Sequence, residues 1–257
     1  MDHPSTTIDQ FTHQAVGFAT AAAMNDADAI QLLLTTARAR TADTVLDVAC
    51  GPGIVAAAFA RKAAEVTGID LTPAMIDLAR ERCASERLDN VRFEIGDVEQ
   101  LPYVDASFSV VLCRYALHHM LRPQAVISEM ARVCAPGGRL VVADVVVGRD
   151  VAVAARFNEV ERLRDPSHVR ALTTSELLDL LRAADLERCA QAGFYPVSME
   201  LRALLSRSAA PDPDAVLNRF EHAIERRETL GLSERRDGDK IRFEFPISIV
   251  VGGRRIS

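Results

Sequence analysis

The sequence predicts a doubly wound α/β protein built on a mostly parallel sheet of seven strands. Three observations point to this fold. Short β-branched, apolar runs alternate with helical segments as far as residue 147. These runs lack the strict polar–apolar alternation of a half-exposed strand, so helices are expected on both faces of the sheet. The chain of 257 residues is long enough to bury a large core without disulfides or metal.

The first part of the chain supplies five strands. Residues 1–40 form two helices, the second beginning after Asn25 with negative charge in its first turn. Thr72 and Pro73 begin another helix, as an N-cap followed by proline at the first helical position. The other expected elements are strand Thr44–Val48, helix Ile54–Lys62, strand Val66–Ile69, strand Val91–Ile95, strand Phe108–Cys113, helix Pro123–Cys134 and strand Leu140–Val147.

The last part of the chain supplies helices and two late strands. Thr173 and Glu176 have the spacing of a capping box at the start of a helix. Pro246 lies inside the last strand and indicates an edge position or a bulge there. The other expected elements are helix Val151–Arg164, strand Glu187–Val197, helices within 200–230, a turn at Arg235–Asp239 and strand Lys240–Val250.

We interpret 1–257 as a single domain with three parts. Residues 1–40 are a helical clasp, 41–148 a ligand-binding core, and 149–257 carry substrate and lid helices with the last two strands. Helical insertions of this kind are expected to cover one end of the sheet.

Composition argues against several classes of protein. The 30 Lys and Arg against 36 Asp and Glu give a net charge of −6, which argues against nucleic acid as a partner. Five cysteines without a CxxC pair favour a reducing, cytoplasmic location. The apolar stretch from Ala15 to Met24 lacks a preceding positive charge, so it does not read as a signal peptide. No apolar run reaches the roughly 18 residues of a membrane span.

A glycine-rich turn at Cys50–Gly53 follows the first strand. Glycines here let the backbone approach a ligand closely, and the following helix presents free N–H groups. The pattern also fits G-x-G-x-x-A with Asp70 about 20 residues on, so a dinucleotide site is one alternative. Asp47 suits the ammonium group of an amino-acid-bearing nucleoside better than it suits a pyrophosphate.

The turn resembles the D-x-A/G-C-G-x-G motif of class I S-adenosylmethionine-dependent methyltransferases. Four further segments resemble that family in the same order: Val66–Leu71, Gly96–Pro102, Ser107–Val111 (with Ser109 where the family usually has Asp) and Arg132–Leu140. The ubiquinone/menaquinone C-methyltransferase-like branch, methyltransferase type 11, is the most similar. The resemblance implies a Rossmann-like methyltransferase fold and S-adenosyl-L-methionine as cofactor.

The resemblance also implies a role for each cofactor-binding residue. Asp70 would accept from both ribose hydroxyls, a charge-assisted arrangement, and Asp97 from the adenine amino group. The backbone carbonyl of Arg114, rather than its guanidinium, would accept from the methionine ammonium. Cys50 is expected to be a small apolar residue that fills the turn. The full set of expected cofactor-binding residues is Asp47, Cys50, Gly51, Gly53, Asp70, Leu71, Met75, Gly96, Asp97, Val98 and Arg114.

The segment Arg114–Met120 follows the fourth strand, where an acceptor would meet the methyl group. His119 and His118 are candidate general bases, because histidine titrates near neutrality, and Tyr115 is a candidate for orienting the acceptor. His119 is preferred because it lies one step further from the strand. This pair of histidines is too few for a metal site, so none is expected. The segment Asp165–Arg170 resembles one found in this branch and is assigned to the lid, with no role given.

Three functions remain open. The first is C- or O-methylation of a small molecule by in-line transfer, which requires mainly alignment and a dry pocket. The second is a non-methylating reaction on the same fold, such as a cyclisation. The third is a dinucleotide-dependent oxidoreductase. A homo-oligomer is also left open.

Overall fold

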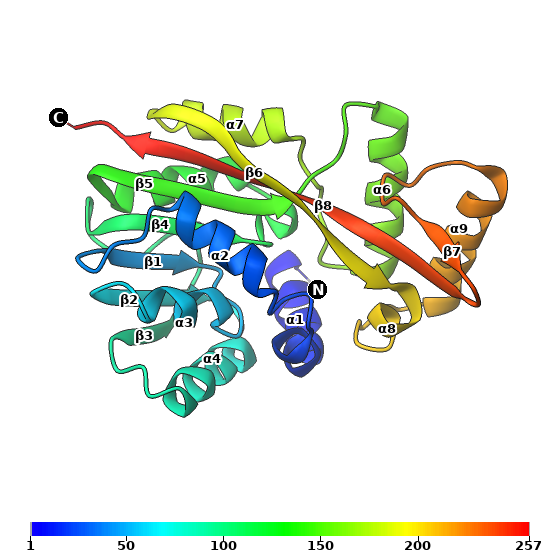
Figure 1. Ribbon diagram of the computed structural model, residues 1–257, viewed down its shortest axis with the longest axis horizontal. Coiled ribbons are helices and arrows are strands. Elements are labelled where there is room, and N and C mark those ends of the chain that lie inside the picture. Colours follow the sequence, from blue (N-terminus) through cyan, green and yellow to red (C-terminus); the bar gives the residue numbers. More distant parts are fainter. Residues whose placement is uncertain (1, 257) are drawn as a thin grey trace.

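The computed structural model describes residues 2–256, which form a mixed sheet covered by helices (Figure 1). The strands are β1 (Thr44–Val48), β2 (Glu65–Asp70), β3 (Val91–Ile95), β4 (Phe108–Arg114), β5 (Cys134–Val145), β6 (Leu186–Glu200), β7 (Arg235–Asp237) and β8 (Lys240–Arg254). The helices are α1 (His3–Thr20), α2 (Ala27–Thr36), α3 (Ile54–Ala60), α4 (Pro73–Ser85), α5 (Pro123–Val133), α6 (Val151–Arg164), α7 (Thr174–Ala183), α8 (Leu201–Leu205), α9 (Pro213–Arg226) and the 3₁₀ helix η1 (Leu117–His119).

The strand order places a ligand site beside β1. The order is β3-β2-β1-β4-β5-β8-β6, with β7 paired to β8. Strands β1 to β5 pair in parallel, whereas β8 is antiparallel to β5 and β6. The chain winds from β1 to β3 in one direction and returns to β4 on the other side of β1. Such a switch point leaves a crevice at the carboxyl ends of the strands, where open α/β sheets bind ligands.

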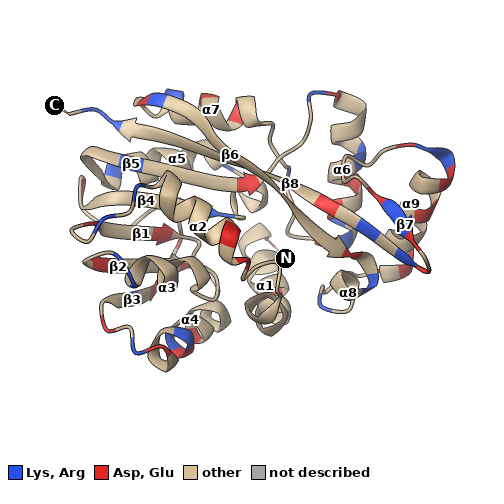
Figure 2. Cartoon of the chain, viewed as in Figure 1, with Lys and Arg blue, Asp and Glu red and all other residues tan. Residues whose placement is uncertain are grey.

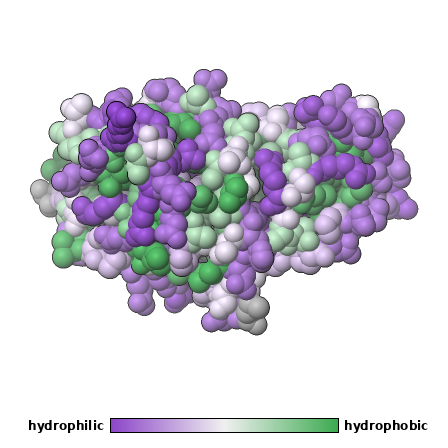
Figure 3. Space-filling view, turned by 90° about the horizontal axis from the view of Figure 1, so that it is seen from below, coloured by the Kyte–Doolittle hydropathy of each residue, from purple (hydrophilic) through white to green (hydrophobic). Residues whose placement is uncertain are grey.

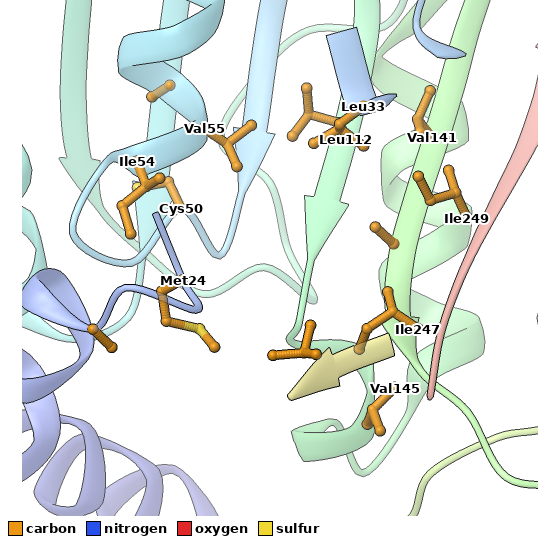
Figure 4. Packing of buried hydrophobic residues seen from close by; sticks show 14 of the residues in the cluster. Met24, Leu33, Cys50, Ile54, Val55, Leu112, Val141, Val145, Ile247 and Ile249 are labelled. Atoms are coloured by element: carbon orange, nitrogen blue, oxygen red, sulfur yellow. The ribbon is translucent and has the colours of Figure 1, made fainter. Parts of the chain in front are cut away.

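Two apolar clusters hold the helices on the sheet. On one face, Leu33 of α2 lies over Leu112 and Val141, and Val55 of α3 lies close by (Figure 4). On the other face, α5 and α7 cover the sheet with residues such as Met130 and Leu177. Both faces of the central strands are therefore buried, as their missing alternation predicts, whereas the edge strand β3 does alternate and buries only Phe93 fully.

A second lobe extends the sheet beyond the end of β5. There β6 and β8 continue together and are joined by β7, α6, α8 and α9 (Figure 1). Lys and Arg are interspersed with Asp and Glu over the surface, and both gather around β7 and α9 (Figure 2). Seen from below, apolar surface in the middle of the molecule is broken up by hydrophilic residues (Figure 3).

The predicted α/β fold is confirmed, with corrections to particular elements. An eighth strand, β7, occupies the stretch that we expected to be only a turn, because its residues pair with the start of β8. Pro246 lies at a local edge, as expected: β8 as a whole is an interior strand, but β5 pairs with it only as far as Ile247. At Pro246 only β6 pairs with β8, so the missing N–H of Pro246 costs no strand pairing. The cap of α2 is Asp26 rather than Asn25, whereas the capping box of Thr173 and Glu176 is confirmed.

Candidate active site

A cavity of about 330 Å³ lies at the carboxyl ends of β1, β2 and β4. Its wall contains most of the residues expected from the sequence to bind a cofactor: Asp47, Cys50, Gly51, Asp70, Leu71, Met75, Asp97, Val98 and Arg114. Helix α1 closes the cavity from the other side with residues that include Phe11 and Phe18. The parallel strands end at the same edge of the sheet, and this brings together residues that are far apart in the sequence.

Two expected residues, Gly53 and Gly96, do not line this cavity. Gly53 has a φ of +72°, and a Cβ there would lie 2.8 Å from the Cβ of Ala79. It therefore lets α3 begin while packed against α4. A Cβ on Gly96 would lie 2.8 Å from Ile69. In contrast, a Cβ on Gly51 would meet nothing within 4 Å, so this turn leaves space for a ligand.

Asp70 is buried and held rigidly at the end of β2. One carboxylate oxygen accepts from Gly51 N–H and the other from Thr72 N–H, each at 2.9 Å. Burial raises the pKa of Asp70, and these N–H groups oppose the rise. Each carboxylate oxygen keeps a lone pair for a further donor. The side chain is thus oriented in advance to accept from two neighbouring hydroxyls.

Asp47 is a buried carboxyl group with one oxygen that has no hydrogen-bond partner among residues 2–256. It is 2% exposed, and its Oδ2 has no hydrogen-bond partner within the described residues. Burial raises the pKa of Asp47 to about 8, although Arg114 opposes the rise. An unpaired buried carboxylate is costly, and a cationic ligand would remove that cost. The ammonium group of S-adenosylmethionine fits this requirement.

The remaining wall is suited to a flat apolar group. Met75 and Val98 are buried, and Leu71 is half-buried beside them. Asp97 is exposed, and one of its oxygens accepts from Glu99 N–H at 2.9 Å. Its second oxygen is therefore available to an amino group at the cavity mouth. Burial raises the pKa of the Cys50 thiol well above its usual value, which favours packing over reactivity.

A second cavity of about 110 Å³ adjoins the first. The two cavities share four lining residues, namely Phe11, Phe18, Tyr115 and His119. Apolar residues of β6, α8 and β8 form much of its wall, and Glu161, Arg164 and Asp165 form a polar side. A group transferred from one cavity to the other would pass these four shared residues.

His119 belongs to a hydrogen-bonded chain that fixes its tautomer. Its Nδ1 lies 3.0 Å from Ser167 Oγ, and Ser167 Oγ donates to Asp165 at 2.5 Å. The hydroxyl of Ser167 has one proton and donates it to Asp165. His119 Nδ1 must therefore be protonated and donate to Ser167 Oγ. Nε2 is left with a lone pair. Burial and the neighbouring His118 lower the pKa of His119, which keeps the ring neutral.

His118 forms a different pair. Its Nδ1 lies 2.6 Å from Asp144 Oδ1, and its backbone N–H donates to the same carboxylate at 3.2 Å. Burial lowers the pKa of His118, but Asp144 outweighs this effect, and the net pKa is raised. His118 lines the second cavity but not the first. The centres of the His118 and His119 rings lie 4.1 Å apart.

Tyr115 adopts a strained backbone conformation between the cavities. Its φ is +57°, a region that costs a non-glycine residue about 1–3 kcal/mol. Its Oη lies 2.7 Å from the Oη of Tyr195. The guanidinium of Arg114 lies over the Tyr115 ring, 4.3 Å from its centre.

Several of these partners were not predicted from the sequence. Asp144 lies in β5 beyond the resembling segment Arg132–Leu140, and Tyr195 lies in β6, where no motif was recognised. Asp165 and Ser167 lie in the segment whose resemblance was noted without a role, and that resemblance was the only available signal. Within residues 2–256, no group of His, Cys, Asp or Glu is arranged to hold a metal ion. Over the same residues, no helix has both the length and the hydropathy needed to cross a bilayer.

Comparisons with known proteins identify the family. A model described as a methyltransferase domain matches residues 39–190. The uncharacterized methyltransferase YcgJ of Bacillus subtilis is 31% identical over 226 residues, which cover 87% of this chain and 89% of that protein. Its crystal structure superposes with a TM-score of 0.81 at 30% identity over 90% of this chain and 99% of that one.

Two further proteins are similar over a smaller share or at lower identity. The 27-O-demethylrifamycin SV methyltransferase of Amycolatopsis mediterranei is 37% identical over 58% of this chain and 55% of that protein. The [4+2]-cyclase SpnF shares the fold, with a TM-score of 0.60 and 23% identity over 90% of this chain and 81% of that one. Since the domain model spans more than half of the chain, and YcgJ is 31% identical over most of both chains and shares the fold, the chain belongs to the class I S-adenosylmethionine-dependent methyltransferases.

Proposed function

We propose that this methyltransferase methylates an oxygen or an acidic carbon of a small molecule, with His119 as general base. The observation that carries the proposal is the position of His119, which lines both cavities and keeps a lone pair on Nε2. Most of the expected cofactor-binding residues line one cavity, and the acceptor would occupy the other. The proposed small-molecule acceptor agrees with the substrate in the name of the rifamycin methyltransferase.

Bound S-adenosylmethionine supplies an electrophilic methyl group on a sulfonium. An acceptor atom in the second cavity would take up that methyl group, and the sulfur would keep the electron pair of the sulfur–carbon bond that breaks. The acceptor loses one proton, which passes to Nε2 of His119. Asp165 and Ser167 hold the ring in the tautomer that can accept this proton. Phe11 and Phe18 line both cavities, and their apolar rings favour a dry site for the transfer.

His118 is the second candidate base, because Asp144 supports it as a carboxylate supports histidine in other proton-transfer sites. The pH dependence of turnover separates the two. If His119 is the base, its lowered pKa keeps turnover flat from pH 6 upward. If His118 is the base, turnover falls as the pH drops through a value above 6.5, the ordinary histidine pKa.

The experiment begins with a screen of metabolite extracts using methyl-labelled S-adenosylmethionine. Replacement of the base by alanine should lower turnover by roughly 10²- to 10⁴-fold while S-adenosylhomocysteine still binds. His222→Ala, on helix α9, is the matched control. Near-normal rates in both His119→Ala and His118→Ala would refute the general-base proposal.

Alternative functions predict different results. A cyclase of the same fold would bind S-adenosylmethionine but transfer no label. An oxidoreductase would bind NAD more tightly than S-adenosylhomocysteine in calorimetry. A cytoplasmic location is part of the proposal and rests on the scattered cysteines.

A further inference from the structure

Two charged residues in the cofactor cavity each have one buried atom without a partner. Within residues 2–256 these atoms are Oδ2 of Asp47 and Nε of Arg114. The other buried polar atoms without a partner belong to Gln10, His168 and Ser248, and none of those residues lines this cavity. One cavity thus contains a carboxyl oxygen and a guanidinium N–H that have no partner among the described residues.

Strand register sets the relative positions of the two residues. Asp47 on β1 pairs with Leu112 on β4, and Arg114 follows two residues later. Because side chains alternate along a strand, Asp47 and Arg114 lie on the same face of the sheet as diagonal neighbours. Both side chains line the same cavity, and the charge of Arg114 acts on Asp47 by opposing the rise in pKa that burial causes.

The guanidinium of Arg114 is fixed by groups other than Asp47. One Nη donates to the Met24 carbonyl at 3.1 Å, and the other donates to Tyr115 Oη at 3.3 Å. The Tyr115 hydroxyl is in turn bonded to that of Tyr195. These contacts hold the cation in place and leave its Nε–H edge unused. A buried charge without full pairing is costly, so the arrangement indicates a missing anionic partner.

We propose that Arg114 binds the carboxylate of the methionine part of the cofactor while Asp47 binds its ammonium group. The two residues then bind the zwitterionic end of the ligand, in which the ammonium and the carboxylate are attached to the same carbon atom. This inference rests on S-adenosylmethionine being the cofactor. It goes beyond the role expected for Arg114 from sequence, which was limited to its backbone carbonyl.

The test compares two ligands that differ only in the carboxylate. S-adenosylhomocysteine has it, and 5′-deoxy-5′-(3-aminopropylthio)adenosine lacks it. Calorimetry should show that the unmodified protein prefers S-adenosylhomocysteine by roughly 10- to 100-fold, as expected for a charge-assisted hydrogen bond. In Arg114→Met, this preference should disappear, because only S-adenosylhomocysteine loses affinity. Unchanged binding of the second ligand also shows that the variant is folded.

Arg122→Met is the matched control. Arg122 lines the same cavity, but its side chain is 72% exposed and is already paired with Glu99. Its replacement should leave the preference intact. Arg114→Lys provides a second variant that keeps the charge but changes the donor geometry, and we expect it to reduce the preference by several-fold.

The outcomes separate this inference from the cofactor assignment. If S-adenosylhomocysteine binds and both Arg114 variants keep the full preference, the carboxylate is held elsewhere and the inference is wrong. If the unmodified protein does not bind S-adenosylhomocysteine, the cofactor assignment fails and the inference fails with it. Loss of the preference in Arg114→Met, with the preference retained in Arg122→Met, supports the inference.

Discussion

The buried carboxylate of Asp47 should make the stability of the ligand-free protein depend on pH. Its pKa is raised from 3.8 to about 8 in the folded state, mainly by burial. The folded protein therefore holds a proton that the unfolded chain releases above pH 3.8. For an acid whose pKa is raised on folding, the free energy of unfolding falls as the pH rises between these two values. The slope is about 1.4 kcal/mol per pH unit.

Asp47→Asn removes the titrating group, and with it this loss of stability at high pH, with little change in side-chain shape. At pH 7 the raised pKa of Asp47 lowers the free energy of unfolding by about 4 kcal/mol, and the substitution removes this effect. The buried amide, without a full set of partners, lowers the free energy of unfolding by about 1–3 kcal/mol. We therefore expect the variant to be more stable at pH 7 by about 1–3 kcal/mol and to lose this advantage near pH 5. Urea denaturation of both proteins at pH 5, 6 and 7, without ligand, measures the difference.

Asp43→Asn is the control, because Asp43 is a buried acid just before the same strand with the opposite pKa shift. Burial opposes the shift, but Arg139 and two other donors lower the pKa of Asp43. Its replacement should destabilise the protein at pH 7 by about 3 kcal/mol. If the difference between Asp47→Asn and the unmodified protein does not change with pH, the reasoning about Asp47 is wrong.

Three further predictions concern the proposed site. Asp70→Ala should weaken S-adenosylhomocysteine binding by about 30- to 150-fold in calorimetry, because the ribose hydroxyls lose a charged acceptor; an unchanged affinity would place the ribose elsewhere. Ser167→Ala should lower kcat by about tenfold or more, because His119 loses the group that fixes its tautomer, while cofactor affinity stays the same; equal kcat values would make Ser167 purely structural. Affinity for S-adenosylhomocysteine should rise about tenfold from pH 6 to pH 7, since Asp47 must lose its proton to bind the ammonium group and its pKa is about 8; calorimetry in buffers of different ionisation enthalpy should show a proton released on binding, and uptake of a proton would contradict this.

The sequence determined those parts of the protein that depend on short stretches of chain. Strands β1 and β2 could be predicted because a buried parallel strand is largely apolar, and β3 because its apolar residues alternate with Arg92 and Glu94, as in a half-exposed edge strand. The motif residues, such as Asp70, could be assigned to the ligand site because each lies near the carboxyl end of its strand. The capping box of Thr173 was predictable for the same reason, since both partners lie within four residues.

The tertiary structure decided the partners of the site residues. His119 meets Ser167 across 48 residues, and Asp144 meets His118 across 26. Asp47 and Arg114 become neighbours only through the register of β1 against β4. Local preference and hydrophobic pattern carry no information about these contacts, because they arise from the packing of whole elements. The packing therefore determines which histidine has a free lone pair and which charges lack a partner.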